Sequence, residues 1–244
     1  MRPEDVPMLF QELARAYADV AGMSVAATGS LARGDHQTGP SGDIVSNLDL
    51  INVVPDGADV SEIRALVGRK MKRITDDFRI ETTSAIARLP VFRRAGHAHY
   101  RISMRPEWFC DGLGLGPDAF DHPGHTEADQ RTALTWMIQP VPYYLAKATV
   151  LDPTTNLAKA RRAALRLADR FDLQLVRDGL DNLPSALRTL IDERSLTPLE
   201  STARYLDTPT HPTVAQLVRD AVFVECMGLS SAESMLVLLP SVSN

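Results

Sequence analysis

The first strong pattern along the chain is helical. Apolar side chains recur three and four positions apart, so they fall on one face of a helix over residues 4–21. They are Val6, Leu9, Phe10, Leu13, Tyr17 and Val20. Gly22 is expected to end this helix, because glycine disfavours its continuation. The short, mostly apolar run 24–28 that follows predicts a strand.

A second group of elements follows a polar loop. Residues 33–46 are rich in Gly, Asp, Ser and Pro, which is typical of a loop. The apolar run 48–54 predicts a buried strand. Residues 59–78 repeat the helical spacing and predict a second helix. Residues 79–84 are expected to form another strand, and residues 91–104 one or two more.

Beyond this region the pattern is helical to the end of the chain, with breaks at prolines and glycines. Glycines and prolines are concentrated between residues 105 and 124, which makes that segment the best candidate for a linker. We therefore predict an α+β protein. Residues 1–110 form a mixed sheet with helices, residues 111–124 form a linker, and residues 125–244 form an α-helical domain.

Composition and charge restrict the classes of function. Hydrophobic residues make up 44% and charged residues 23%, as in an ordinary globular protein, and the formal net charge is −5. An acidic balance argues against broad nucleic-acid binding. The chain contains no apolar stretch long enough to span a membrane, and its N-terminus has acids where a signal peptide needs bases. These features predict a cytoplasmic protein, with Cys110 and Cys226 as reduced thiols.

The stretch that carries chemistry begins where the first predicted strand ends. Residues 28–36 read Thr-Gly-Ser-Leu-Ala-Arg-Gly-Asp-His. Gly29 allows a ligand to approach the backbone closely, and the amides after it can point at phosphate oxygens. The Ser30 hydroxyl adds a further donor. This turn is typical of a phosphate-binding site.

The next predicted strand supplies oxygen ligands. Asn47 and Asp49 are two positions apart, and side chains at this spacing project from the same face of a strand. Two oxygen donors beside a phosphate-binding turn suit Mg²⁺. Phosphoryl transfer needs little more from a protein than positioned metal ions and held phosphates.

Together these residues resemble the signature of the polymerase-β-like nucleotidyltransferase superfamily, in which a glycine–serine pair precedes a strand with two acids. The Ala-Arg-Gly-Asp stretch after Ser30 is similar to small bacterial members, including antibiotic-modifying enzymes. The resemblance covers roughly residues 20–85. It implies that Gly29 and Ser30 contact phosphates, that Asp49 is a metal carboxylate and that Glu81 supplies a third one.

The sequence departs from this signature at Asn47, which stands where the first metal carboxylate is expected. Its amide oxygen can bind a metal but brings no negative charge, so Mg²⁺ is expected to bind more weakly. Asp43, in the long loop before it, either swings toward the metal or is a plain loop residue. We favour the loop interpretation.

The activity implied by the resemblance is transfer of a nucleoside monophosphate from Mg²⁺-bound ATP, or another nucleoside triphosphate, to a hydroxyl of a small-molecule acceptor. Arg33 either supports the loop or reaches the β- and γ-phosphates. Lys147, on a predicted helix of the second domain, either reaches the triphosphate or is solvated. Glu81 is the candidate that deprotonates the acceptor. The resemblance also implies a homodimer, because small-molecule members often build their cleft across a dimer.

Two alternatives stay open. The chain is a degenerate member that binds a nucleotide or a protein partner without catalysis, as Asn47 suggests, or its scaffold serves another reaction in a specialised pathway. Elsewhere, the glycines of residues 112–116 lack the spacing of a dinucleotide-binding loop and read as a linker. Four histidines lack a supporting cysteine pair and read as surface or loop residues rather than zinc ligands. They are His97, His99, His122 and His125.

Overall fold

The chain folds into two compact units of the α+β class. The computed structural model describes residues 1–94, 104–120, 134–149, 152–176, 179–196, 200–207 and 212–241. Among these, the residues up to Phe120 and those from Met227 onward form the first unit, and those from Leu134 to Cys226 form the second. In the described part of the chain, no helix is long and apolar enough to cross a membrane.

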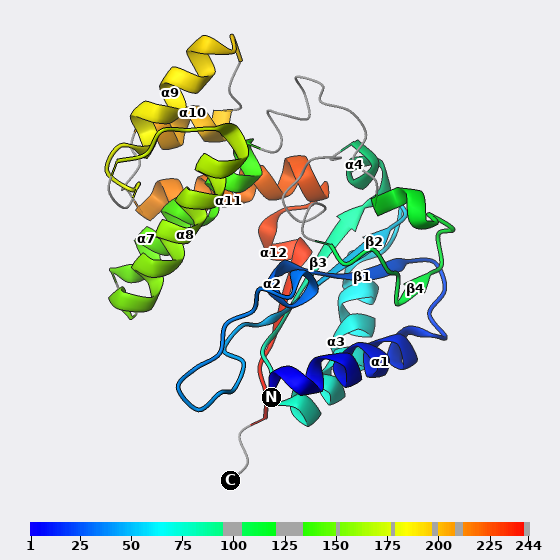
Figure 1. Cartoon of the computed structure of the whole chain (residues 1–244). Helices are drawn as coiled ribbons and strands as arrows, with labels where there is room; N and C mark the ends of the chain where they lie inside the picture. Colours follow the sequence, from blue (N-terminus) through cyan, green and yellow to red (C-terminus); the bar gives the residue numbers. More distant parts are fainter. Residues whose placement is uncertain are drawn as a thin grey trace. The chain divides into compact units, whose positions relative to one another are not determined.

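The first unit is built on a mixed sheet of five strands in the order β4-β1-β2-β3-β5 (Figure 1). The pair β2 and β3 is parallel, and the other neighbouring pairs are antiparallel. The elements of the unit are η1 (Pro3–Asp5), α1 (Val6–Tyr17), β1 (Ser24–Thr28), α2 (Gly29–Arg33), β2 (Leu48–Val54), α3 (Val60–Phe78), β3 (Thr82–Arg88), α4 (Leu89–Arg94), β4 (Cys110–Asp111), η2 (Pro117–Phe120), α12 (Ser231–Ser234) and β5 (Met235–Leu238).

The core of this unit lies between one face of the sheet and the helices α1 and α3, which lie together in Figure 1. Alternate strand residues point into it. They include Val25, Ala27, Leu48, Leu50 and Ile86. The side chains between them therefore project from the opposite face, and this alternation assigns Asp49 to that second face.

The predicted helices 4–21 and 59–78 and the predicted strands 24–28 and 48–54 correspond to α1, α3, β1 and β2. Asp59 caps the start of α3, because its carboxylate accepts hydrogen bonds from the amides of Ser61 and Glu62 at 2.8 and 3.2 Å.

The strand predicted over residues 79–84 is wrong at its start, because β3 begins only at Thr82. Arg79 adopts a left-handed conformation with φ of 53° at the end of α3, and the amide of Ile80 bonds back to the carbonyl of Thr75. These two residues close the helix, so the strand begins at Thr82 and continues to Arg88.

The strands predicted over residues 91–104 are wrong where the structure describes this region. Residues 89–94 form the helix α4. Pro90 lies in its first turn. Backbone amides in a first turn have no acceptor within the helix, so the missing amide proton of proline costs no hydrogen bond there. The rest of the predicted strands lies largely outside the described residues, as do His97, His99, His122 and His125.

Residues 104–120, predicted mainly as linker, belong to the first unit instead. The amides of Arg105, Phe109 and Gly112 donate to carbonyls of Ala27, Val25 and Met23 at 2.8–2.9 Å, so the segment runs along β1. Its glycines fold around a carboxylate of the chain itself. Asp111 accepts hydrogen bonds from the Ser24 hydroxyl at 2.6 Å and from the Leu115 and Gly116 amides at 2.9 and 2.8 Å.

The end of the chain also differs from the predicted helical domain 125–244. The chain returns to the first unit at Met227 and adds β5 beside β3. Arginine side chains from α3 and from the residue that caps its C-terminal end hold this return. Arg64 donates to carbonyls of Glu233 and Met235, and Arg79 to that of Ser241. The local sequence pattern did not predict β5, because the pairing of this strand with the distant strand β3 leaves no signal in the local sequence.

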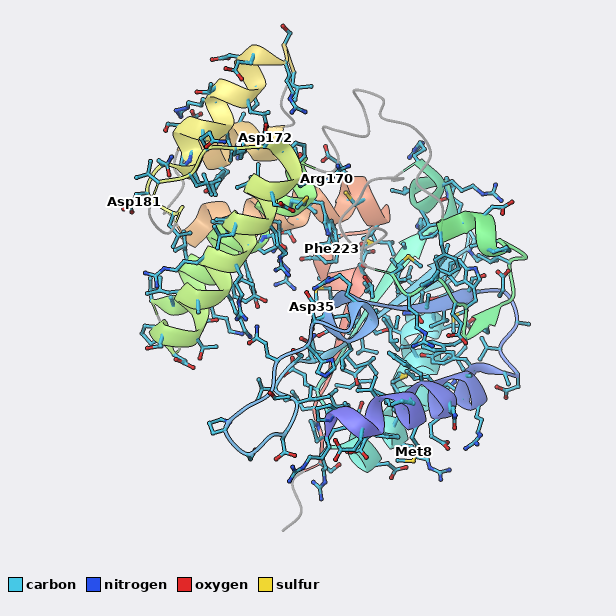
Figure 2. All side chains as sticks on the ribbon, viewed as in Figure 1. Met8, Asp35, Arg170, Asp172, Asp181 and Phe223 are labelled. Carbon is cyan, nitrogen blue, oxygen red and sulfur yellow. The ribbon has the colours of Figure 1, made fainter. Side chains whose placement is uncertain are left out.

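The second unit is helical. Its described helices include α7 (Pro140–Ala148), α8 (Pro153–Phe171), α9 (Leu183–Glu193), α10 (Glu200–Asp207) and α11 (Pro212–Met227). The helix α8 buries Ala160, Ala163 and Ala164, and it packs against α7. Phe223, labelled in Figure 2, packs against Trp136 with ring centroids 5.6 Å apart. Cys226, in α11, is buried, and Cys110, in the first unit, is half-buried.

We predict that Asp111→Asn lowers the free energy of unfolding at pH 7 by about 1–3 kcal/mol, because the amide cannot accept all three hydrogen bonds. Burial alone raises the pKa of Asp111, but the bonds from Ser24, Leu115 and Gly116 outweigh it and lower this pKa. A lowered pKa stabilises the fold above the unfolded value, near 4, and the contribution is lost as the pH falls through the folded value.

Urea unfolding between pH 7 and pH 3 measures this difference. The difference in the free energy of unfolding between Asp111→Asn and the unchanged protein should become smaller as the pH falls below about 4. The exposed Asp118, in η2, provides the control Asp118→Asn, which should have little effect at either pH. A gap that stays constant with pH would contradict this role for the carboxylate.

Candidate functional site

The turn after β1 and the carboxylate of Asp49 meet at one point. Gly29 has a φ of +77°, a conformation that glycine adopts without steric cost. A Cβ atom added at Gly29 would lie 2.2 Å from Oδ2 of Asp49. The contact follows from strand pairing, because Thr28, the residue before the turn, pairs with Asp49 in β2.

Asn47 lies beside Asp49 and holds its carboxylate. The Asn47 Nδ2 atom donates to Asp49 Oδ1 at 2.5 Å and to the Thr83 hydroxyl at 3.1 Å. An ionised carboxylate only accepts hydrogen bonds, so the amide must turn its nitrogen toward Asp49. Asn47 therefore acts as a donor to Asp49, and it bridges β2 to β3.

Thr83 is the residue that sequence reasoning missed. It pairs directly with Asp49 across the parallel strands β2 and β3 and lies half-buried. The predicted strand 79–84 made Glu81 the expected neighbour of Asp49. If Arg79 and Ile80 are assigned to the end of α3, the predicted strand begins later in the chain. Thr83 then becomes the expected neighbour of Asp49.

Glu81 lies just before β3 and is exposed. Its backbone carbonyl accepts a hydrogen bond from the Leu48 amide at 2.9 Å, which fixes the start of the β2–β3 ladder. The alternation of a strand, continued back from β3, assigns the Glu81 side chain to the same face of the sheet as Thr83.

Gly29 is the first residue of the five-residue helix α2, which is followed by a polar loop. Ser30 is half-buried beside the turn. The Arg33 guanidinium pairs with Asp35, with its Nη2 atom 3.0 Å from Asp35 Oδ1. Figure 2 labels Asp35 beyond the end of α2. The pairing corresponds to the loop-supporting role considered for Arg33.

Asp43 is engaged within the loop, as the loop interpretation expected. Its carboxylate accepts a hydrogen bond from the Ser41 hydroxyl at 2.8 Å and lies 3.4 Å from Nε of Arg2. The Ser41 hydrogen bond is the main cause that lowers the pKa of Asp43.

Lys147 lies in α7, in the second unit. Its ammonium lies over the ring of Tyr143, 5.8 Å from the ring centroid. A cation over an aromatic ring in this way is a common packing arrangement within one helix.

The donor set around Asp49 carries little negative charge. Among the residues that the structure describes, no three His, Cys, Asp or Glu side chains are grouped to hold a metal ion. Asp49 offers one carboxylate, and Asn47 and Thr83 are neutral. Mg²⁺ at nucleotide sites is often held by one or two carboxylates together with the phosphates of the substrate. The site therefore fits one Mg²⁺ that arrives with a nucleotide, and it does not fit a two-metal pair.

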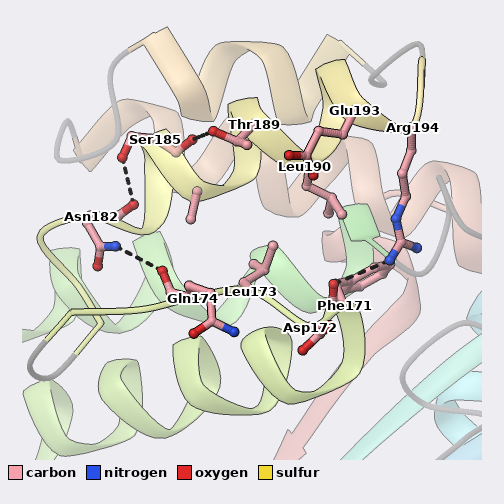
Figure 3. A pocket seen from close by; sticks show the side chains of 11 residues that line it. Phe171, Asp172, Leu173, Gln174, Asn182, Ser185, Thr189, Leu190, Glu193 and Arg194 are labelled. Atoms are coloured by element: carbon pink, nitrogen blue, oxygen red, sulfur yellow. Dashed lines mark hydrogen bonds between the residues drawn. The ribbon is translucent and has the colours of Figure 1, made fainter.

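The second unit contains a separate pocket of about 420 Å³, between the end of α8 and α9 (Figure 3). Its polar groups bond to one another. Asn182 donates to the carbonyl of Gln174 at 3.2 Å, Ser185 donates to that of Asn182 at 3.1 Å, and Arg194 to that of Phe171 at 3.4 Å. Since these groups already have partners, the pocket is a weaker candidate than the site at Asp49.

Comparisons with protein-family models, with curated proteins and with solved structures found no match to the chain. The assignment of a function therefore depends on the residues of the site and on their geometry.

We predict that Gly29→Ala destabilises the protein more than Gly34→Ala does. Both glycines have positive φ, at +77° and +80°, so both substitutions carry the same backbone strain of about 1–2 kcal/mol. Only at Gly29 does the new methyl group meet Asp49, while nothing lies within 4 Å of a Cβ at Gly34. The excess at Gly29 should be about 1–3 kcal/mol, the usual cost of overpacking.

Chemical denaturation of the two variants checks this prediction. Equal losses of unfolding free energy in Gly29→Ala and Gly34→Ala would mean that the turn and the carboxylate are not in contact in solution. Adding Asp49→Ala to each variant refines the comparison, because it should remove the excess at Gly29 and leave the loss at Gly34 unchanged.

Proposed function

We propose that the chain binds a nucleoside triphosphate with its Mg²⁺ at the Gly29–Asp49 site and transfers the nucleoside monophosphate to a hydroxyl of a small-molecule acceptor. The observation that carries this proposal is the approach of the turn to the carboxylate, with a Cβ at Gly29 only 2.2 Å from Asp49 Oδ2. A polyphosphate on the turn and its bound cation on Asp49 would then be neighbours.

Each residue of the site supports one part of this binding. The Gly29–Ser30 turn offers backbone amides and a hydroxyl to phosphate oxygens. Asp49 offers a carboxylate to the Mg²⁺ of the nucleotide, which neutralises phosphate charge. Asn47 keeps Asp49 oriented through its 2.5 Å hydrogen bond. Arg33, although paired with Asp35, remains a candidate for contacts with the triphosphate.

The proposed reaction is a displacement at the α-phosphorus. The acceptor oxygen forms a bond to this phosphorus, the bond from the phosphorus to the bridging oxygen breaks, and pyrophosphate leaves. The hydroxyl proton passes to the carboxylate of Glu81, which is exposed to solvent.

A second candidate function is nucleotide binding without transfer. Its support is the hydrogen bonding of Asn47, whose amide nitrogen donates to Asp49 and Thr83. A neutral amide thus occupies the position where the resemblance expects the first metal carboxylate, which would help to hold a second ion. Without that ion the acceptor hydroxyl is activated less.

We predict that Asp49→Asn weakens binding of the Mg²⁺ complex of α,β-methylene ATP by about tenfold or more, because it removes the charge that faces the cation. Isothermal titration calorimetry measures this change. Asp43→Asn is the matched control, since Asp43 is engaged by Ser41 and Arg2 and should leave the affinity unchanged. No binding by the unchanged protein, together with no thermal stabilisation by any Mg²⁺-nucleotide, would reject both candidate functions.

We predict that Asn47→Asp lowers the melting temperature without divalent cations, because two carboxylates then face each other without a counter-charge. Mn²⁺ should restore it and bind more tightly than to the unchanged protein, as Mn²⁺ electron paramagnetic resonance can measure. Pyrophosphate release with a panel of hydroxylated acceptors then separates the two functions. Turnover by the unchanged protein supports transfer, and turnover gained only with Asn47→Asp supports binding alone.

A further inference from the structure

Strand pairing produces a row of side chains that extends from the site toward β5. Thr28 pairs with Asp49, Asp49 with Thr83, and Thr83 with Val237. Directly paired residues on neighbouring strands project from the same face of a sheet. Neighbouring strands lie about 4.8 Å apart, so Val237 lies about 10 Å from Asp49 across the sheet.

The end of this row is apolar and open to solvent. Val237 is 50% exposed and Leu239, just beyond β5, is 63% exposed. Leu236 and Leu238 alternate with them and pack against the core on the other face. The alternation of a strand therefore directs Val237 toward the face of Asp49, and it assigns Leu239 to the same side. We call Val237 and Leu239 the apolar pair.

The order of the strands relates the apolar pair to the proposed reaction. The phosphate-binding turn lies on the β1 side of Asp49, and the apolar pair lies on the opposite side, beyond β3. In phosphoryl transfer the attacking and leaving oxygens are roughly in line. If pyrophosphate leaves toward Gly29, the acceptor hydroxyl enters across Thr83, and the rest of the acceptor extends over β5.

We infer, on the basis of the proposed function, that the acceptor is a hydroxyl-bearing molecule with an extended apolar body, which packs on Val237 and Leu239 while its hydroxyl reaches Asp49. Val237 and Leu239 thus determine specificity by burying apolar surface of the acceptor.

Binding of methyl, hexyl and octyl β-glucosides, each below its micelle concentration, tests this inference, because they share hydroxyls and differ only in apolar length. For the unchanged protein, affinity should rise about tenfold or more from methyl to octyl. The double variant Val237→Thr/Leu239→Gln should lose about fivefold or more for the octyl compound and nothing for the methyl one. Threonine keeps the β-branched shape that suits a strand.

The matched control is Val224→Thr, at a valine of α11 that is 54% exposed, and it should bind all three glucosides as the unchanged protein does. An affinity that does not depend on tail length, or an equal tail dependence in the double variant, would overturn the inference. So would a dimer of the unchanged protein that the double variant dissociates, seen by sedimentation, because a second copy would then cover the apolar pair.

Titration of the same samples with the Mg²⁺ complex of α,β-methylene ATP distinguishes the two proposals. Nucleotide binding without tail dependence rejects the apolar acceptor and leaves the proposed function standing. Tail dependence that the double variant loses, without nucleotide binding, rejects the proposed function while the apolar pair still binds such molecules. If the double variant binds the nucleotide as tightly as the unchanged protein does, this supports a role of Val237 and Leu239 in binding the acceptor alone.

Discussion

The hydrogen-bonded ladder that joins β1, β2 and β3 is the constraint on which the site depends. It pairs Thr28 with Asp49 and Asp49 with Thr83. A slip of one residue would turn Asp49 into the apolar core and bring Leu48 or Leu50 out of it. The burial of those leucines therefore holds the register, and the register brings the carboxylate against Gly29. The same strand register is therefore required both for the stability of the core and for the geometry of the site.

Charge is the second constraint. Where several carboxylates meet, they repel one another unless a cation joins them. Here Asn47 supplies an amide hydrogen bond to Asp49 instead of a second charge. The Asp49 carboxylate thus has a neutral hydrogen-bond donor beside it, and any Mg²⁺ that the site binds must gain most of its ligands from a substrate and from water. This balance underlies both candidate functions.

The first unit is closed by segments from distant parts of the chain. Residues 104–120 run along β1 at one edge of the sheet, and β5 pairs with β3 at the other. The glycines of residues 112–116 serve this closure, since they allow the backbone to wrap Asp111. The second, helical unit is thus inserted in the chain between two parts of the first unit.

The sequence by itself determined α1, β1, β2 and α3, because each has a strong local period or cap, and it indicated Gly29, Asn47 and Asp49 through their spacing. Tertiary structure alone decided that Thr83 rather than Glu81 faces Asp49, that Asn47 donates to Asp49, and that the chain returns to form β5. The reason is physical. Helical periods and caps act within a few residues, whereas strand partners and side-chain hydrogen bonds depend on residues far apart in the chain.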